Sequence, residues 1–270
     1  MTEVPAPSRT AVVTGASGFL GFACVRELVD HAWDVLAVVH RRRHPRLEDL
    51  AAEGRVRLAS ASITSFSALR RALDGAARSR CLIHAAGRAT DVGRDRAFRR
   101  VNLDGTIQAC RLVHALDIDR LIHVSTTDVY GVGDQECVPE TARMRNNRSN
   151  PYPKYKILAE RAVRTLLPPS RRVVLRPGLV WGPGDVTVLP RVLAFLGSSP
   201  WIVHFGGWRG ANRWPLAYVG NLARMARAAA TWDDALGESY NVVDPEPTTV
   251  DGYYRMLARA FLPEALARRS

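Results

Sequence analysis

The chain has 270 residues, of which 47% are hydrophobic, and its formal net charge is +12 at pH 7. It has no apolar run of membrane-spanning length and does not begin with a secretory signal pattern, so we expect a soluble, cytoplasmic protein. The charge alone would suit nucleic-acid binding. However, only Lys154 and Lys156 are lysines, so 38 − 2 = 36 of the basic residues are arginines, and these are scattered from end to end, which disfavours that function.

Short apolar runs alternate with amphipathic segments between residues 10 and 176, after a loose leader at residues 1–9. The runs expected to form buried strands are Ala11–Thr14, Val35–Val39, Val56–Ala59, Cys81–Ala85, Leu121–Ser125 and Val173–Arg176. This alternation predicts an α/β fold with a parallel, doubly wound sheet of Rossmann type. Residues 177–270 are punctuated by proline, glycine and tryptophan. We expect them to form mainly a small substrate-binding lobe, with some segments returning to the core.

A phosphate-binding turn is predicted directly after the first strand. In the segment Thr14–Gly21, Gly15 permits a tight turn, Gly18 lets the backbone approach a pyrophosphate, and Gly21 allows close helix packing. The following helix would direct its N-terminal N–H groups at the anion. The sequence therefore predicts a dinucleotide cofactor.

The end of the second strand distinguishes between NAD and NADP. It carries His40, Arg41 and Arg42 and no carboxylate that would accept the ribose 2′-hydroxyl of NAD. Guanidinium groups suit a 2′-phosphate, so NADP(H) is favoured and NAD(H) remains an alternative. The other interpretation is a solvated loop in an arginine-rich protein.

The catalytic pair is predicted from the spacing of a phenol and an ammonium. Tyr152 and Lys156 stand one helical turn apart, and Pro153 is tolerated in the first turn of a helix. A nearby ammonium stabilises the phenolate form of a tyrosine and so allows proton transfer near neutral pH. Such a pair would transfer a proton to or from a substrate oxygen.

The segment Ser125–Gly131 lies at the end of the fifth strand. Together with the glycine turn and the Tyr152 and Lys156 pair, it resembles the extended short-chain dehydrogenase/reductase family. Further matches are His84–Gly87, Asn102–Thr106, Leu175–Pro177, Gly182–Gly184 and Tyr218–Asn221. The resemblance implies Tyr152 as general acid/base, Lys156 as holder of the nicotinamide ribose, Thr126 as the hydroxyl at the reacting oxygen and Asn102 as a support. It also implies cofactor contacts from Ser17, Phe19, Leu20, Ser62, Ile63, Ala85, Ala86, Gly87, Pro177, Gly178 and Val180.

Some positions depart from the family pattern. Ser62 stands where relatives often have an aspartate that contacts the adenine amine, and Leu179 stands where nucleotide-sugar enzymes usually carry an asparagine for the diphosphate. The pattern is closer to the hydroxysteroid-dehydrogenase and dihydroflavonol-reductase branch. Candidate substrate residues are Thr127, Asp128, Trp181, Trp208 and Trp214. Asp128 is either a second acid/base group or a helix-cap carboxylate.

We expect an enzyme that transfers hydride between a nicotinamide and a secondary alcohol or ketone of a small, partly apolar metabolite. The alternative is a nucleotide-sugar epimerase or dehydratase with self-recycling NAD. A cofactor sensor without catalysis is disfavoured because the catalytic residues are intact. The resemblance further implies a homodimer through Ala97–Leu116 and Tyr152–Leu166. The four cysteines show no C-x-x-C spacing, so no metal site is expected.

Overall fold

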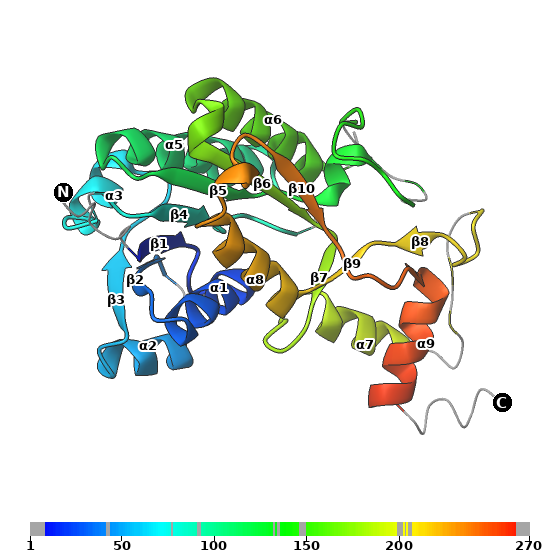
Figure 1. Ribbon diagram of the computed structural model, residues 1–270. Coiled ribbons are helices and arrows are strands. Elements are labelled where there is room, and N and C mark those ends of the chain that lie inside the picture. Colours follow the sequence, from blue (N-terminus) through cyan, green and yellow to red (C-terminus); the bar gives the residue numbers. More distant parts are fainter. Residues whose placement is uncertain are drawn as a thin grey trace.

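The computed structural model describes residues 9–41, 44–76, 78–90, 93–131, 133, 136–145, 150–198, 202, 204 and 207–262. In this part of the chain a seven-stranded parallel sheet lies between two layers of helices (Figure 1). The strands are β1 (Thr10–Thr14), β2 (Asp34–Val39), β3 (Val56–Ser60), β4 (Cys81–His84), β5 (Arg120–Val124), β6 (Arg172–Pro177) and β10 (Ser239–Val242), in the spatial order β10-β6-β5-β4-β1-β2-β3. The predicted doubly wound fold is confirmed.

The helices cover both faces of this sheet (Figure 1). On one side lie α3 (Phe66–Ala72), α4 (Asp95–Phe98), α5 (Gly105–Ala115) and α6 (Pro151–Leu166). On the other lie α1 (Phe19–Asp30), α2 (Pro45–Ala52) and α8 (Val219–Ala229). None of the helices among the described residues combines the length and apolarity needed to cross a bilayer.

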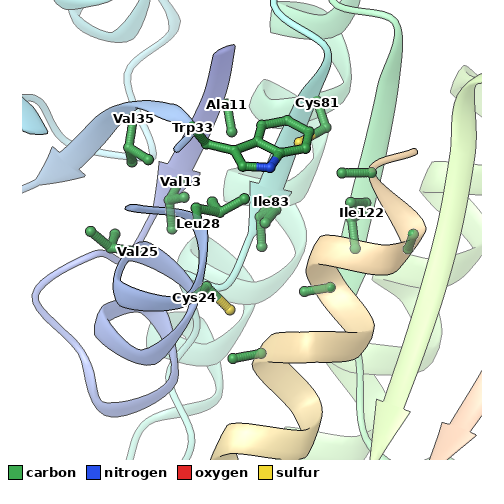
Figure 2. Close-up of a cluster of buried hydrophobic side chains, with 14 of the residues drawn as sticks. Ala11, Val13, Cys24, Val25, Leu28, Trp33, Val35, Cys81, Ile83 and Ile122 are labelled. Atoms are coloured by element: carbon green, nitrogen blue, oxygen red, sulfur yellow. The ribbon is translucent and has the colours of Figure 1, made fainter. Parts of the chain in front are cut away.

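The strands are buried on both faces, which explains why they are continuous apolar runs rather than alternating ones. In β1, Val13 packs towards α1 and α8, whereas Val12 packs towards α3 and α5. Figure 2 shows the first of these clusters, in which Leu28 of α1 and Trp33 lie against β1 and β4. Trp33 is therefore a core residue. This dense packing fixes the carboxyl ends of the strands, where the candidate site lies.

Two segments after residue 177 return to the sheet. β10 adds a seventh strand beside β6, and α8 packs along α1, where Arg227 Nε donates to Glu27 Oε1 at 2.7 Å. The sequence pattern predicted six strands and did not single out β10, which is only four residues long.

The remaining elements form a smaller lobe. They are β7 (Leu179–Trp181), α7 (Leu189–Ser198), β8 (Arg213–Trp214), β9 (Leu216–Tyr218), β11 (Thr248–Thr249) and α9 (Val250–Phe261). β7 pairs with β9 and β8 with β11 in two short sheets, while α7 and α9 pack on each other. The division at residue 177 into a core and a substrate-binding lobe stays a prediction.

Candidate active site

The glycine turn after β1 has the shape that a phosphate-binding turn requires. Gly15 adopts φ +72°, and a Cβ there would lie 2.7 Å from the backbone of Ala86. A Cβ on Gly21 would lie 2.0 Å from the Gly15 carbonyl oxygen, so helix α1 can approach the turn only without a side chain at that position. Gly18 caps α1 with no side chain to accept from the first N–H groups. These groups are the kind that bind a pyrophosphate.

Two cavities meet at this turn, and both include Gly15 and Gly87 in their walls. The first cavity, of about 600 Å³, extends along the carboxyl ends of β5 and β6 towards the C-terminal lobe. The second cavity, of about 540 Å³, lies at the carboxyl end of β2. A dinucleotide needs such a two-part cleft centred on its pyrophosphate, so the residues present fit the predicted cofactor.

The second cavity carries positive charge from two arginines. His40, Arg41 and Arg88 line it, and no aspartate or glutamate is found among its described lining residues. Ser17, Ile63 and Ala86 also lie in its wall, whereas Ser62 does not and hydrogen-bonds to Thr64 at 3.0 Å. Arg42, also predicted to bind the cofactor, lies outside the described residues.

Asn102 supports the loop that follows β4. Its Oδ1 accepts from Arg88 N at 2.7 Å and its Nδ2 donates to Arg88 O at 3.2 Å, so the amide clamps the backbone next to Gly87. Asn102 belongs to a π-helical turn, Arg99–Asp104, between α4 and α5; such turns are frequent at functional sites. It is fully buried and does not line either cavity.

A buried histidine connects this loop to the glycine turn. Thr106 Oγ1 donates to Asn102 O at 2.7 Å, so it accepts from His84 Nε2 at 3.1 Å. His84 Nδ1 then accepts from Thr14 Oγ1 at 2.8 Å. Burial first, and the charge of Lys156 second, lower the pKa of His84 to about 3, so the imidazole is neutral and the chain of hydrogen bonds has one direction.

The candidate catalytic residues come from β5 and α6. Asn150 caps α6, accepting from Tyr152 N at 2.9 Å, and Pro153 occupies its first turn, where no N–H is needed. This start places Tyr152 and Lys156 in the wall of the first cavity. Thr126, just after β5, accepts from Asp128 N at 3.2 Å and also hydrogen-bonds the Tyr152 side chain. The phenol of Tyr152 and the hydroxyl of Thr126 therefore lie close together in the wall of the first cavity.

The electrostatic surroundings set the protonation of both α6 side chains. Desolvation, and then the negative charge of Asp128, raise the pKa of Tyr152, while the hydrogen bond with Thr126 opposes this. Burial lowers the pKa of Lys156 to about 8, and Glu160 partly offsets it. Lys156 Nζ donates to Val124 O at 2.7 Å and lies 5.9 Å from the Tyr152 ring centroid. Both groups remain largely protonated at neutral pH.

Sequence comparison adds a decisive observation. Residues 11–242 match the model of the NAD dependent epimerase/dehydratase family. The chain belongs to this family. Both the predicted family and the Rossmann fold are therefore confirmed, and dependence on a nicotinamide cofactor follows at the level of the family.

Two relatives of known activity are reductases. The chain is 31% identical over 252 residues to the 2-alkyl-3-oxoalkanoate reductase of Stenotrophomonas maltophilia, covering 87% of this chain and 71% of that protein. It is 29% identical over 193 residues to the enzyme of the same name from Shewanella oneidensis, covering 68% of this chain but only 48%, about half, of that protein. The UDP-glucose 4-epimerase structure from Thermotoga maritima superimposes with a TM-score of 0.77 at 21% identity, covering 93% of this chain and 82% of that one. This last likeness concerns the fold.

The other residues predicted from the family pattern are divided between the two cavities. The wall of the first also contains Gly18, Phe19, Leu20, Gly21, Ala85, Pro177, Gly178 and Val180. Of the candidate substrate residues, Thr127, Asp128 and Trp214 line it. Trp181 instead donates to Asp244 Oδ2 at 2.6 Å, and Trp208 is half exposed; neither is found in the described cavity walls.

Several wall residues of the first cavity were not anticipated from the sequence. They are Asn150, Thr187, Val188, Arg191, Asn212 and Pro215. Pro215 reaches the cavity because β7 pairs with β9. The pairing brings the carbonyl of Pro215 against Gly178, and a Cβ on Gly178 would lie 2.1 Å from the Pro215 oxygen. The pairing joins residues almost forty positions apart and has no local signal. Arg88, in the wall of the second cavity, was not anticipated either, although it directly follows the His84–Gly87 motif.

Proposed function

We propose that this chain is an NADP(H)-dependent oxidoreductase that interconverts a secondary alcohol and a ketone. The observation that carries the proposal is that Thr126, Tyr152 and Lys156 line one cavity together with the glycine turn after β1. A hydroxyl, a phenol and an ammonium beside a dinucleotide-binding turn supply the groups needed for proton transfer at a carbonyl.

Each residue has a defined task. NADP(H), when bound, exchanges a hydride with the substrate carbon. In the reduction direction Tyr152 donates its proton to the substrate oxygen, and its raised pKa keeps it in the protonated form. Thr126 hydrogen-bonds the same oxygen. Lys156 holds the nicotinamide ribose, and its positive charge stabilises the phenolate that remains on Tyr152. Asn102 keeps the loop at Gly87 in place through both backbone bonds to Arg88.

Preference for NADP(H) over NAD(H) is supported by the second cavity. Its described wall contains Arg41 and Arg88, besides His40, but no carboxylate, and the charge of the two guanidinium groups suits a 2′-phosphate. Arg42 follows Arg41 in the sequence and would extend the same positive segment.

The substrate we propose is a small, partly apolar molecule. Trp214, Leu179, Val180, Val188 and Pro215 give the first cavity an apolar wall. The two similar reductases are named for 2-alkyl-3-oxoalkanoates, which favours a ketone with a second oxygen function on a nearby carbon. Cytoplasmic location and a homodimer through Ala97–Leu116 and Tyr152–Leu166 stay predictions.

A nucleotide-sugar epimerase or dehydratase is the second candidate. Asp128 favours it, since a carboxylate in the cavity close to Tyr152 offers a second acid/base group. Leu179 disfavours it, because an apolar side chain stands in the cavity wall where nucleotide-sugar enzymes usually hold a diphosphate.

Titration of the purified protein with NADPH and NADH, followed by nicotinamide fluorescence, tests the cofactor assignment. We expect tighter binding of NADPH, and Arg41→Ala should weaken NADPH by about 10-fold or more while leaving NADH almost unchanged, because one charge-assisted contact to the phosphate is lost. Arg224→Ala, an exposed arginine on α8, is the control for net charge. Equal affinity for both cofactors, or NAD retained through purification, contradicts the assignment and favours the epimerase or dehydratase.

A further inference from the structure

One buried guanidinium lies between the elements that carry the candidate catalytic residues. Arg176, on β6, donates through Nε to Glu160 Oε1 at 3.0 Å and through Nη2 to Glu160 Oε2 at 2.7 Å. Both side chains are at most 1% exposed. On α6, Glu160 follows Lys156 by one helical turn and Tyr152 by two. The pair therefore fixes α6 against the sheet close to both catalytic residues.

The same guanidinium holds the turn that follows β5. Its Nη1 donates to the hydroxyl of Tyr130 at 2.7 Å. Tyr130 is the last residue of a short helical turn, Thr127–Tyr130, and Thr126 is the N-cap of that turn. Tyr130 also belongs to an apolar cluster with Ile157 of α6. Thr126 and Tyr130 thus lie at the two ends of one turn, and Arg176 fixes the far end.

The hydroxyl of Tyr130 is fixed from both sides. Arginine can only donate hydrogen bonds, so the Tyr130 oxygen accepts from Arg176 and its proton is directed to Asn241 Oδ1, at 2.7 Å. Asn241 Nδ2 donates to Val138 O at 2.8 Å, which sets the orientation of the amide. Every hydrogen bond in this series therefore has one direction, and the hydroxyl joins β6 to β10.

The turn and α6 are connected at two points. At the cavity, the Thr126 hydroxyl hydrogen-bonds the side chain of Tyr152. In the core, Arg176 joins Tyr130 of the turn to Glu160 of α6. A substrate oxygen that enters between Thr126 and Tyr152 would replace the first connection. The second connection would stay, because its residues are not found in the described cavity walls.

We propose that Tyr130 is a positioning residue: through its hydroxyl, Arg176 holds Thr126 where it binds the same substrate oxygen as Tyr152. The proposal rests on the redox function proposed for this site. Tyr130 acts through Thr126 and has no contact of its own with the reacting atoms. Because a misplacement of about 1 Å can lower a rate by about 100-fold, a small loosening of the turn is enough for a measurable loss.

Tyr130→Phe tests this role, since it removes one hydroxyl and keeps the ring. Arg176 Nη1 still donates to Glu140 O at 2.8 Å, so the guanidinium keeps an acceptor and the fold should persist. The reaction followed is the reduction of ethyl acetoacetate, acetophenone or cyclohexanone by NADPH, whichever the wild type reduces fastest. We expect kcat/KM to fall by about 5- to 20-fold, while the Kd for NADPH, from fluorescence titration, stays within about twofold.

A double-mutant cycle with Thr126 separates positioning from a merely structural role. Thr126→Val keeps the shape of the side chain and removes its hydroxyl, so Tyr130 has no hydroxyl left to position. Adding Tyr130→Phe to Thr126→Val should therefore lower kcat/KM by less than about twofold. Thr126→Ser retains the hydroxyl, and there Tyr130→Phe should keep its full effect. Equal fold losses in the Thr126→Val and Thr126→Ser backgrounds would overturn the proposal.

Tyr155→Phe is the matched control. Tyr155 is likewise a buried tyrosine, and its hydroxyl donates to Asp95 on α4, outside the series that contains Arg176. We expect kcat/KM of this variant to stay within about twofold of the wild type. A loss as large as that of Tyr130→Phe would contradict the proposal, because the removal of any buried hydroxyl near α6 would then have the same effect.

The outcomes distinguish the positioning role from the redox function. If the wild type reduces a ketone but the cycle shows no coupling between Tyr130 and Thr126, the positioning role is wrong and the redox function stands. If the wild type reduces none of the three ketones with either NADPH or NADH, both proposals are overturned.

Discussion

The sheet and the C-terminal lobe are built with different amounts of core. Around the sheet, whole strands are buried on both faces, and helices on each side contribute fully buried leucines and valines. In the described part of the lobe the buried apolar cluster is small, namely Leu196, Leu216, Tyr253, Leu257 and Ala258, and the other apolar residues packed against it are only partly buried. Val186, Trp208 and Met256 remain about half exposed. The half that holds the glycine turn and Tyr152 is thus the rigid one, and the half that shapes the far wall is more adaptable.

The ion pairs of the two regions also differ in how deeply they are buried. Near the site, Arg176 forms a bidentate pair with Glu160 at 3.0 and 2.7 Å, and both side chains are at most 1% exposed. In the lobe, Asp251 pairs with Arg255 at 2.6 Å, with side-chain exposures of 31% and 55%. The buried pair ties α6, and with it Lys156, to β6. The exposed pair joins residues one helical turn apart on α9.

The largest expected effect concerns the rigid half. Tyr152→Phe removes the proton donor and keeps the ring, so kcat/KM should fall by about 100- to 10,000-fold, the usual contribution of a general acid or base. The affinity for NADPH, measured by fluorescence titration, should stay within a few-fold. Retained turnover would show that Tyr152 is not the proton donor, and would contradict the assignment of catalysis to the rigid half.

Removing one carboxylate from each region measures how much each ion pair contributes to the free energy of unfolding. Glu160→Gln leaves the buried guanidinium of Arg176 without its counter-charge and should lower the free energy of unfolding by about 3–5 kcal/mol. Asp251→Asn, in the partly exposed pair with Arg255 on α9, should lower it by less than about 1 kcal/mol. Urea denaturation of both variants measures the difference. Equal losses would show that the lobe is as tightly built as the sheet.

The smallest effect is a displacement of the pH profile. The negative charge of Asp128 disfavours the Tyr152 phenolate and raises the pKa of the phenol. Asp128→Asn removes this charge, so the pKa falls, and the midpoint at which alcohol oxidation rises with pH should move to lower pH. Asp128→Glu keeps the charge and serves as the control. An unchanged midpoint in Asp128→Asn, or an equal displacement in both variants, contradicts this electrostatic account.

The same contrast explains what could be predicted from the sequence. Buried parallel strands are continuous apolar runs, and Gly15 and Gly21 are required by contacts within the turn, so both leave local signals. The spacing of Tyr152 and Lys156 is likewise local, since one helical turn joins them. The doubly wound sheet and the family were therefore accessible before the structure.

Residues that depend on distant pairing were not accessible. Arg191, Thr187 and Pro215 reach the first cavity through the pairing of β7 with β9 and the packing of α7 on α9, which link short segments of irregular spacing. The four-residue strand β10 was missed for the same reason. Tryptophan content suggested Trp181 and Trp208 as substrate residues, but composition does not tell which face a side chain takes, and the Trp181 indole is directed to Asp244.

Isotope transfer from the cofactor tests the central claim most directly. The protein is incubated with NADPH deuterated at both hydrogens of nicotinamide C4 and with a 3-oxo acid, and the product is analysed by mass spectrometry. A net reductase yields a 3-hydroxy acid carrying one deuterium at C3 and one NADP⁺ per product molecule, and Tyr152→Phe yields almost none. Products without deuterium, or turnover of a nucleotide sugar with no net NADP⁺ formed, would contradict the account.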